Sequence, residues 1–513
     1  MKIDPHYIYS FALAGALTIL GGCSEFLEEE DPSNIAPETY FTLAEHAAPA
    51  VNATYENLRF LSGGAGIFSN NFQLLDALSG TARTETAQNS DLNNLYGFSY
   101  TGDNLHLGQW WRELYEGIAN ANLAIDKIPT IPPPFDEAER DRLLGQAHFL
   151  RALHYFWLVR LWGDVPLVTK PVYNLGSTDM FPTRTPVAEL YEVIVNDLLI
   201  AESAGLPFRD ESGRASTGAA KSLLANVYLT MAGYPLNRGA EYYQKATDKA
   251  REVIESNEFS LFPNYNDLHI RANKNKVEHI FMVQYSVSAN IDNGNQPLLH
   301  PNIKDMSAYG TEIGTTVPTV EFYNSYEPGD QRTVDQAGYF YTTYYAGGSG
   351  APFDLNNPYI FKHFDFEANG VPGSGGSGRS DLNWPLIRYA EVLLTFAEAS
   401  NEISGPTADA VGAVKLVRDR AGLATPETGA LTMESFRNLI LKERWHELCF
   451  EGITWFDMLR LRKVYDEESD SFEEFVGATL ATGITLQDKH LLLPIPAADM
   501  RNNPSLTTNN PGW

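Results

Sequence analysis

The hydrophobic positions of this chain are most regular between residues 143 and 162. Leucine, alanine and tryptophan recur there every three or four residues, which is the period of one helix face. The opposite face is apolar as well, with Phe149 and Val159 among its members. A helix that is apolar nearly all round is expected to lie between other helices rather than on a surface. Gly163 and Pro166 follow directly and predict where this helix ends.

The same helical period recurs along much of the chain. Segments that show it are 107–128, 136–162, 187–203, 219–232, 241–256, 386–400, 407–421 and 433–463. The sequence from Arg151 aligns with the sequence from Lys221, an offset of 70 residues that is roughly twice the tetratricopeptide period. Each is followed by a second amphipathic segment. We therefore predict a mainly α fold in which degenerate tetratricopeptide-like helix pairs stack into a superhelix, with large insertions between the repeats.

Residues 281–366 have a different character. They contain 16 aromatic residues in 86 positions, against 12% in the whole chain, and no helical period survives there. The sequence VPGSGGSGRS (371–380) predicts a flexible loop. Residues 58–104 resemble 281–366 in kind, with tyrosines beside asparagines. Long loops on a rigid scaffold commonly carry function, so we expect the ligand-binding surface in these loops.

Composition and charge narrow the class of protein. The chain has 513 residues, of which 43% are hydrophobic and 20% are charged, as is typical of a folded globular protein. The net charge of −28 argues against nucleic acid and anionic membrane surfaces as partners, because both would need a basic face. There are two cysteines, Cys23 and Cys449, so no intramolecular disulfide is left if Cys23 carries a lipid.

The N-terminus has the pattern of a secretion signal. Residues 8–20 form an apolar run of 13 residues, which is too short to span a bilayer as a helix. The sequence Leu-Gly-Gly-Cys that ends at Cys23 resembles the bacterial lipobox, in which the cysteine is lipidated and becomes the first residue of the mature chain. We predict a signal peptide at 1–22, lipid attachment at Cys23 and a flexible acidic tether over 23–40. The alternative is a signal anchor with an incidental cysteine.

No catalytic or metal motif in the chain is complete. His446 and Glu447 begin an HExxH-like string, but Phe450 stands at its fifth position. The sequence also has no phosphate loop, no nucleophile elbow and no full EF-hand loop. His148 and His154 lie in the apolar helix and are expected to be core residues. We therefore expect no enzymatic activity, no cofactor and no bound metal.

Three carboxylates form the most enzyme-like pattern. Glu443, Glu447 and Glu451 have the spacing i, i+4, i+8, which places them on one helix face roughly 6 Å apart, within the range of a glycosidase pair. The basic residues close to them in sequence are Arg444, Arg460 and Arg462. Pairing with these arginines would lower the carboxyl pKa values instead of raising one for general acid chemistry. We therefore interpret the three glutamates as partners in structural salt bridges.

Several motifs together resemble the SusD/RagB family of surface lipoproteins of Bacteroidetes-type bacteria. The sequence RALHYFWLVRLWGDVPLV from Arg151 is similar to the family's core helix and the turn that follows it. The sequence ERWHELCFEGITWFDMLR from Glu443 is similar to the family's C-terminal helix signature. Further similar stretches are WRELYEGIANA (111–121), VPTVEFYNSYEPGDQR (317–332), DLNWPLIRYAEVLLTFAEA (381–399) and the closing LLPIPAADMRNNPSLTTNNPGW. The acidic residues after Cys23 resemble the family's export signal to the outer face of the outer membrane.

The resemblance implies a SusD-like domain over residues 41–513. Its parts would be a helical-repeat part at about 41–270, a loop-rich ligand-binding part at about 271–385, and C-terminal helices with an extended tail at 386–513. It also implies a cell-surface lipoprotein, anchored by lipid in the outer membrane, that captures oligosaccharides. Such a protein would deliver them to a SusC-like TonB-dependent transporter. The alternatives are a peptide-binding RagB-like lipoprotein and a glycoside hydrolase.

The binding residues of this family lie in variable loops, so the candidates here are chosen by chemistry. Tyrosine rings stack on the C–H faces of sugars, while amide, carboxylate and guanidinium groups bond to sugar hydroxyls. The candidates for stacking are Tyr96, Tyr100, Tyr309, Tyr341 and Tyr344, and those for hydrogen bonding are Asp76, Arg83, Asn94 and Asn295. The alternative for each single tyrosine is that it packs a long loop onto the helices.

Overall fold

The computed structural model describes residues 40–66, 68–86, 89–173, 177–303, 312–345, 352–370, 377 and 379–513. The predicted signal peptide, Cys23 and most of the tether lie outside the described residues, as does Tyr309. The helices are α3 (Ala47–Asn57), α4 (Gln73–Ser79), α5 (Ser90–Tyr96), α6 (Leu105–Lys127), α7 (Glu137–Trp162), α8 (Val187–Ser203), α9 (Thr217–Ala232), α10 (Ala240–Glu255), α11 (Val320–Asn324), α12 (Phe366–Asn369), α13 (Tyr389–Ser404), α14 (Ala408–Arg420), α15 (Met433–Glu447), α16 (Thr454–Leu461) and α17 (Ala497–Asn502). The strands are β1 (Ala82–Arg83), β2 (Val165–Pro166), β3 (Arg184–Thr185), β4 (His279–Val283), β5 (Val317–Pro318), β6 (Phe340–Tyr345), β7 (Pro352–Ile360), β8 (Trp384–Arg388), β9 (Lys463–Asp466) and β10 (Ser471–Glu474).

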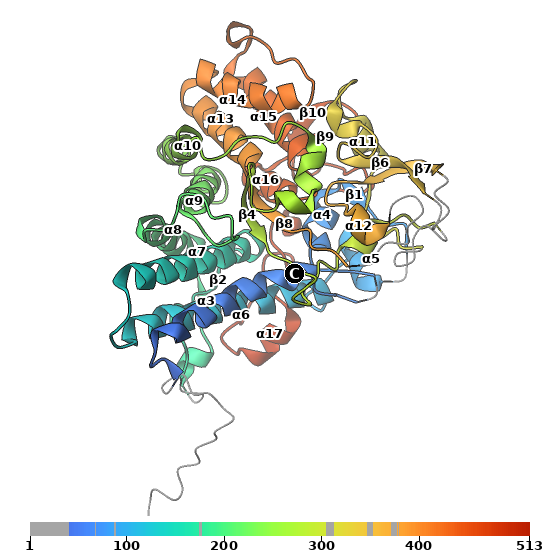
Figure 1. Ribbon diagram of the computed structural model, residues 1–513. Helices are drawn as coiled ribbons and strands as arrows, with labels where there is room; N and C mark the ends of the chain where they lie inside the picture. Colours follow the sequence, from blue (N-terminus) through green and yellow to red (C-terminus); the bar gives the residue numbers. More distant parts are fainter. Residues whose placement is uncertain are drawn as a thin grey trace, which may run out of the picture.

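The longer helices form a stack in which each packs on the next. Helix α3 packs on α6, α6 on α7, α7 on α8, and the order continues through α9 and α10 to α13, which contacts both α14 and α15 (Figure 1). This arrangement confirms the predicted mainly α fold of stacked helix pairs. The remaining chain, with the short strands, lies against one side of the stack (Figure 1).

Helix α7 is the buried centre that its apolar pattern predicts. Nearly every side chain from Leu143 to Trp162 is buried. The helix begins after Asp136, whose side chain accepts a hydrogen bond from the Glu139 backbone N–H, and it ends at Gly163, which has a φ of +70°. A left-handed φ of this kind favours glycine, so the predicted end is confirmed.

The packing of α6 against α7 depends on a residue without a side chain. A Cβ at Gly117 of α6 would lie 2.2 Å from His154 Nε2 and 2.5 Å from Asn57 Oδ1. His154 is fully buried, and its Nδ1 lies 2.6 Å from the Leu150 carbonyl oxygen. Burial lowers the pKa of this imidazole to about 4, so it is a neutral core residue, as expected.

Two predicted segments have different boundaries in the structure. The single helix expected over 433–463 is two helices, α15 and α16, joined by a turn in which Phe450 and Gly452 have φ values of +57° and +71°. A Cβ at Gly452 would lie 2.8 Å from Leu75 Cδ1, so the turn packs closely on α4. The helix expected from 386 begins at Tyr389, because the residues before it form β8.

The strands pair antiparallel across long stretches of sequence. Within the described residues the pairs are β1–β5, β2–β3, β4–β8, β6–β7 and β9–β10. Strands β6 and β7 lie within the aromatic-rich stretch 281–366, where no regular structure was expected. One large hydrophobic cluster runs through most of the helical stack and these loops, so the core is continuous across the expected part boundaries at 270 and 385.

Candidate functional site

The three glutamates of the glycosidase-like pattern lie in a buried ion network. Glu447 is 0% exposed and accepts hydrogen bonds from Arg420 Nη2 at 2.7 Å and Arg388 Nη1 at 3.2 Å. Arg332 Nη1 lies 2.7 Å from Glu443 Oε1, and Arg388 Nη2 lies 2.7 Å from Glu451 Oε1. The interpretation of the three glutamates as partners in structural salt bridges is therefore confirmed.

The expected partners of these glutamates were wrong, however. Arg444 pairs with Asp457 at 2.8 Å, Arg460 pairs with Glu398 at 2.5 Å, and Arg462 lies over the Tyr234 ring at 5.1 Å. The turn at Gly452 separates α16 from α15, so arginines near in sequence point elsewhere. The bonded arginines come instead from β8, α14 and the segment before β6.

The electrostatics of this network do not suit general acid chemistry. The surrounding arginines hold the pKa of Glu447 at about 2, against burial, and the pKa of Glu451 also lies below its ordinary value. The expected lowering was wrong for Glu443, whose pKa burial raises, but this carboxylate is 2% exposed and paired with Arg332 and Arg418. All three carboxylates are at most 8% exposed, which leaves no room for a sugar between them. Removal of any one member would leave a buried charge without its partner, which is strongly destabilising.

The candidate tyrosines within the described residues are buried. Tyr96, Tyr100, Tyr341 and Tyr344 are 6%, 2%, 1% and 3% exposed. The hydroxyl of Tyr96 donates to the Thr315 carbonyl oxygen at 3.0 Å, and that of Tyr341 donates to the Leu299 carbonyl oxygen at 2.7 Å. Tyr100 stacks on Trp513 with ring centroids 5.1 Å apart. In this structure these rings pack loops onto the body of the protein and present no face to a ligand.

The candidate polar residues divide into buried and accessible ones. Asp76 is 4% exposed, and burial raises its pKa to about 7. Asn295 is 0% exposed and accepts a hydrogen bond from Asn70 Nδ2 at 2.9 Å. Arg83 and Asn94 are only partly buried. Arg83 pairs with Glu85 at 2.9 Å, with 32% of its side chain exposed. Among the described candidates, Arg83 and Asn94 are therefore the ones that a ligand could reach.

The structure joins the two loop regions that the sequence singled out. Strand β1 from the early loop pairs with β5 from the late one. Asn70 bonds to Asn295, and the Tyr359 hydroxyl donates to Glu85 Oε2 at 3.0 Å. We call the surface formed by the described residues of 58–104 and 281–366 the loop face.

Among its described residues, the loop face carries an exposed aromatic side chain that sequence reasoning missed. Phe68 is 38% exposed and has a φ of +53°, a backbone conformation that is costly for a phenylalanine. It lies two residues before Asn70, which reaches across to the Gly294 carbonyl oxygen at 3.2 Å. Only exposure distinguishes Phe68 from the other aromatic residues of this stretch, and exposure has no signature in the sequence.

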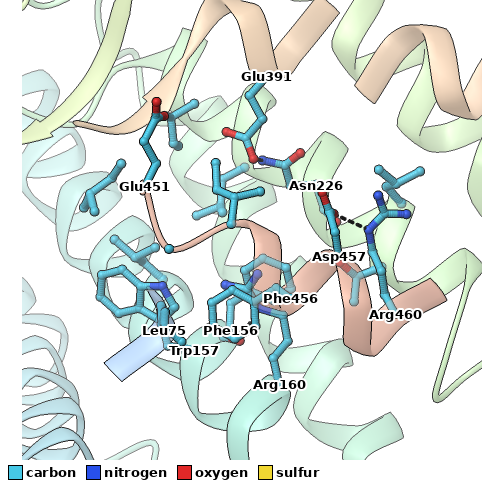
Figure 2. A pocket seen from close by; sticks show the side chains of 18 of the residues that line it. Leu75, Phe156, Trp157, Arg160, Asn226, Glu391, Glu451, Phe456, Asp457 and Arg460 are labelled. Atoms are coloured by element: carbon cyan, nitrogen blue, oxygen red, sulfur yellow. Dashed lines mark hydrogen bonds and ion pairs between the residues drawn. The ribbon is translucent and has the colours of Figure 1, made fainter. Parts of the chain in front are cut away.

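Three of the cavities among the described residues are lined by none of Phe68, Arg83 and Asn94. One, of about 80 Å³, is lined by Trp157, Glu391 and Arg460 among others (Figure 2). A groove of about 460 Å³ is lined by Trp111, Phe181 and residues of α17. A cleft of about 710 Å³ lies between the C-terminal ends of α7 and α9 and the chain's tail.

The described residues contain no group of histidine, cysteine, aspartate and glutamate side chains that could hold a metal ion. Within the same ranges, no helix is both long and apolar enough to cross a membrane. The thiol of Cys449 is buried, and burial raises its pKa to about 11.

Comparison with known proteins assigns this fold to a family. Residues 319–513 match a family model described as "SusD family", and residues 25–229 match one described as "Starch-binding associating with outer membrane". A SusD superfamily protein from Parabacteroides distasonis has a crystal structure that is 36% identical, with a TM-score of 0.85, over 94% of this chain and 100% of that one. The chain belongs to the SusD family.

More distant relatives match along their full length. SusD-like protein P2 from Formosa agariphila is 28% identical over 532 residues, which covers 98% of this chain and 99% of the relative. Surface glycan-binding protein A from Bacteroides thetaiotaomicron, solved in complex with laminarihexaose, is 19% identical with a TM-score of 0.69, over 91% of this chain and 99% of that one. This last likeness shows a shared fold.

Proposed function

We propose that this protein is a cell-surface glycan-binding lipoprotein that captures oligosaccharides without cleaving them. The observation that carries the proposal is the match of residues 25–229 to the starch-binding, outer-membrane-associated family. The fold relative in complex with laminarihexaose supports it. The buried, arginine-paired state of Glu443, Glu447 and Glu451 favours binding over hydrolysis.

The glycan is proposed to bind on the loop face. Phe68 supplies an exposed ring for the apolar face of a sugar, and Arg83 and Asn94 supply accessible polar groups for its hydroxyls. The buried tyrosines would then support the loops rather than touch the ligand.

Titration calorimetry with laminarihexaose and maltohexaose, on protein that starts after Cys23, tests this proposal. We expect Phe68→Ala to weaken binding about tenfold, the cost of losing one stacking ring. Its melting temperature should stay close to wild type, because the ring is exposed. Leu416→Ala is the matched control, since Leu416 is 51% exposed on α14. Equal affinities of wild type and Phe68→Ala, where wild type binds, would place the site elsewhere. Binding of peptides in place of both glycans would favour the RagB-like alternative.

The proposal includes a lipid anchor at Cys23 and delivery to a SusC-like transporter in the outer membrane. An obligate lid needs an interface of more than about 2,000 Å². Purification from detergent-solubilised outer membranes should therefore recover a partner of transporter size. Recovery of this protein alone, under conditions that keep comparable complexes intact, would count against a stable transporter complex.

A further inference from the structure

The cleft of about 710 Å³ has a charge opposite to that of the whole protein. Five cationic side chains line it, namely Arg160, Arg184, Arg460, Arg462 and Lys489, while its acidic side chains are Asp164 and Asp488. The chain as a whole has a net charge of −28. A local excess of positive charge in so acidic a protein concentrates anions at this cleft.

Most of these cations have no ionic partner in the fold. Arg460 is neutralised by Glu398 and Asp457. The other four form no salt bridge with any of the described residues, among which cationic side chains are otherwise widely paired. Asp164 accepts a hydrogen bond from the Val187 backbone N–H at the start of α8. Asp164 and Asp488 act on Arg184 and Arg462, but the four cations without a salt bridge outnumber these two acids, so the cleft keeps a net positive charge.

Arg160 is held in position by aromatic rings rather than by a carboxylate. Its guanidinium carbon lies 3.6 Å from the centre of the Phe156 ring and 3.5 Å from that of Phe456, and Figure 2 shows the three side chains together. Its Nε donates to the Phe156 carbonyl oxygen at 2.9 Å. Glu391 lines the neighbouring cavity of about 80 Å³ together with Arg160, and burial raises the pKa of that carboxyl to about 7. Glu391 is thus only partly ionised near neutral pH and compensates Arg160 poorly.

Tyr191 adds a polar group without a partner. Its side chain lines the cleft and is 1% exposed. Its hydroxyl has no hydrogen-bond partner among the described residues. A buried hydroxyl left without a partner costs free energy, so a ligand that bonds to it would recover that cost.

We propose that this cleft, which we call the cationic cleft, binds the carboxylate or sulfate groups of an anionic oligosaccharide. Arg160, Arg462 and Lys489 would hold the charged groups, and Tyr191 would bond to a ligand oxygen. The exposed ring of Tyr234, over which Arg462 lies, borders the cleft and offers a face for a sugar ring. The volume is within the range of pockets that hold small ligands. The assignment to a saccharide rests on the proposed glycan-binding function, whereas the anion preference rests on the cleft alone.

Calorimetry with three probes tests the proposal: trigalacturonate, a sulfated trisaccharide of the same length, and uncharged maltotriose. We expect at least one charged probe to bind in the cleft, with an affinity that falls as salt rises. Tyr191→Phe and the double variant Arg462→Gln/Lys489→Gln should each weaken that binding about tenfold, as expected for lost charge-assisted hydrogen bonds.

Matched controls separate binding from folding. Tyr100→Phe removes another buried hydroxyl without a partner among the described residues, outside the cleft. Arg112→Gln/Lys415→Gln makes the same change in net charge at exposed positions. Both controls should bind the charged probe as wild type does. All four variants should melt near the wild-type temperature. The two hydroxyls have no described hydrogen-bond partner, and the ion pairs of Arg112 and Lys415 are exposed. Arg462 and Lys489 each lose one cation–π contact, with the rings of Tyr234 and Trp513.

The outcomes are distinct for the two proposals. If laminarihexaose or maltohexaose binds but neither charged probe does, anion binding at the cationic cleft is refuted and the proposed function stands. If no saccharide binds, the proposed function fails as well. Binding of a charged probe that is unchanged in Tyr191→Phe and in the double variant refutes the cleft as its site. Binding of inorganic sulfate alone refutes the assignment to a saccharide.

Discussion

The substitution Glu447→Gln tests the buried ion network most directly. Gln keeps the shape of the side chain but removes the charge that faces Arg388 and Arg420. Both arginines and Glu447 are at most 3% exposed at their side chains, so water cannot replace the lost carboxylate. Breaking a buried pair from one side costs about 3–5 kcal/mol. We expect a loss of that size in the free energy of unfolding at pH 7.

The pH dependence of stability gives an independent measure of what the Glu447 carboxylate contributes. The pKa of Glu447 falls from 4.5 to about 2 on folding, which corresponds to about 3 kcal/mol of stability. Because the folded pKa is the lower one, this stability is present above pH 4.5 and is lost as the pH falls towards 2. The difference between wild type and Glu447→Gln should therefore shrink over this window.

Urea unfolding of both proteins at pH 7, 5, 4 and 3 measures these differences. Glu434→Gln is the matched control, because Glu434 is exposed on the same helix, and its effect should stay within about 0.5 kcal/mol. A Glu447→Gln protein as stable as wild type at pH 7 would refute the reasoning. So would a deficit that stays constant from pH 7 to pH 3.

Further predictions concern single positions. Glu391→Gln should stabilise the protein by about 3 kcal/mol at pH 8 in urea unfolding and have little effect below pH 4.5. Burial raises the pKa of Glu391 to about 7, so ionising this side chain above that pH lowers the stability of the wild type. Equal stability of the two proteins at pH 8 would contradict this. Gly117→Ala should lower stability by about 1–3 kcal/mol in the same assay, since its Cβ meets His154, while Gly108→Ala, with open space around it, should not. Tyr341→Ala should lower the melting temperature and reduce the free energy of unfolding by about 3–5 kcal/mol, because the ring is 1% exposed. A weakened glycan affinity at an unchanged melting temperature would show instead that the ring binds ligand. Cys23→Ala should abolish membrane attachment without changing the melting temperature, and its recovery with membranes in a strain that lacks the transporter would contradict the lipid anchor.

The sequence by itself determined the helical scaffold. The segments predicted at 187–203, 219–232 and 407–421 correspond to α8, α9 and α14 with boundaries that differ by at most two residues. Helix α7 could be predicted as buried because its apolar residues cover both faces. These features depend on residues three or four positions apart, and that spacing is visible in a single chain.

Tertiary structure alone decided which residues meet and which stay accessible. Arg332 and Arg388 bond to carboxylates at Glu443 and Glu447, at distances along the chain that no local period reports. A tyrosine such as Tyr341 looks the same in sequence whether it packs a loop or faces solvent, so the stacking candidates could not be separated from core residues. The cationic cleft gathers side chains from residues 159 to 511, and its charge arises only when the chain folds. Hydrophobic periodicity reports which face of an element is buried, while the choice of neighbour depends on how distant elements fill space and pair their charges.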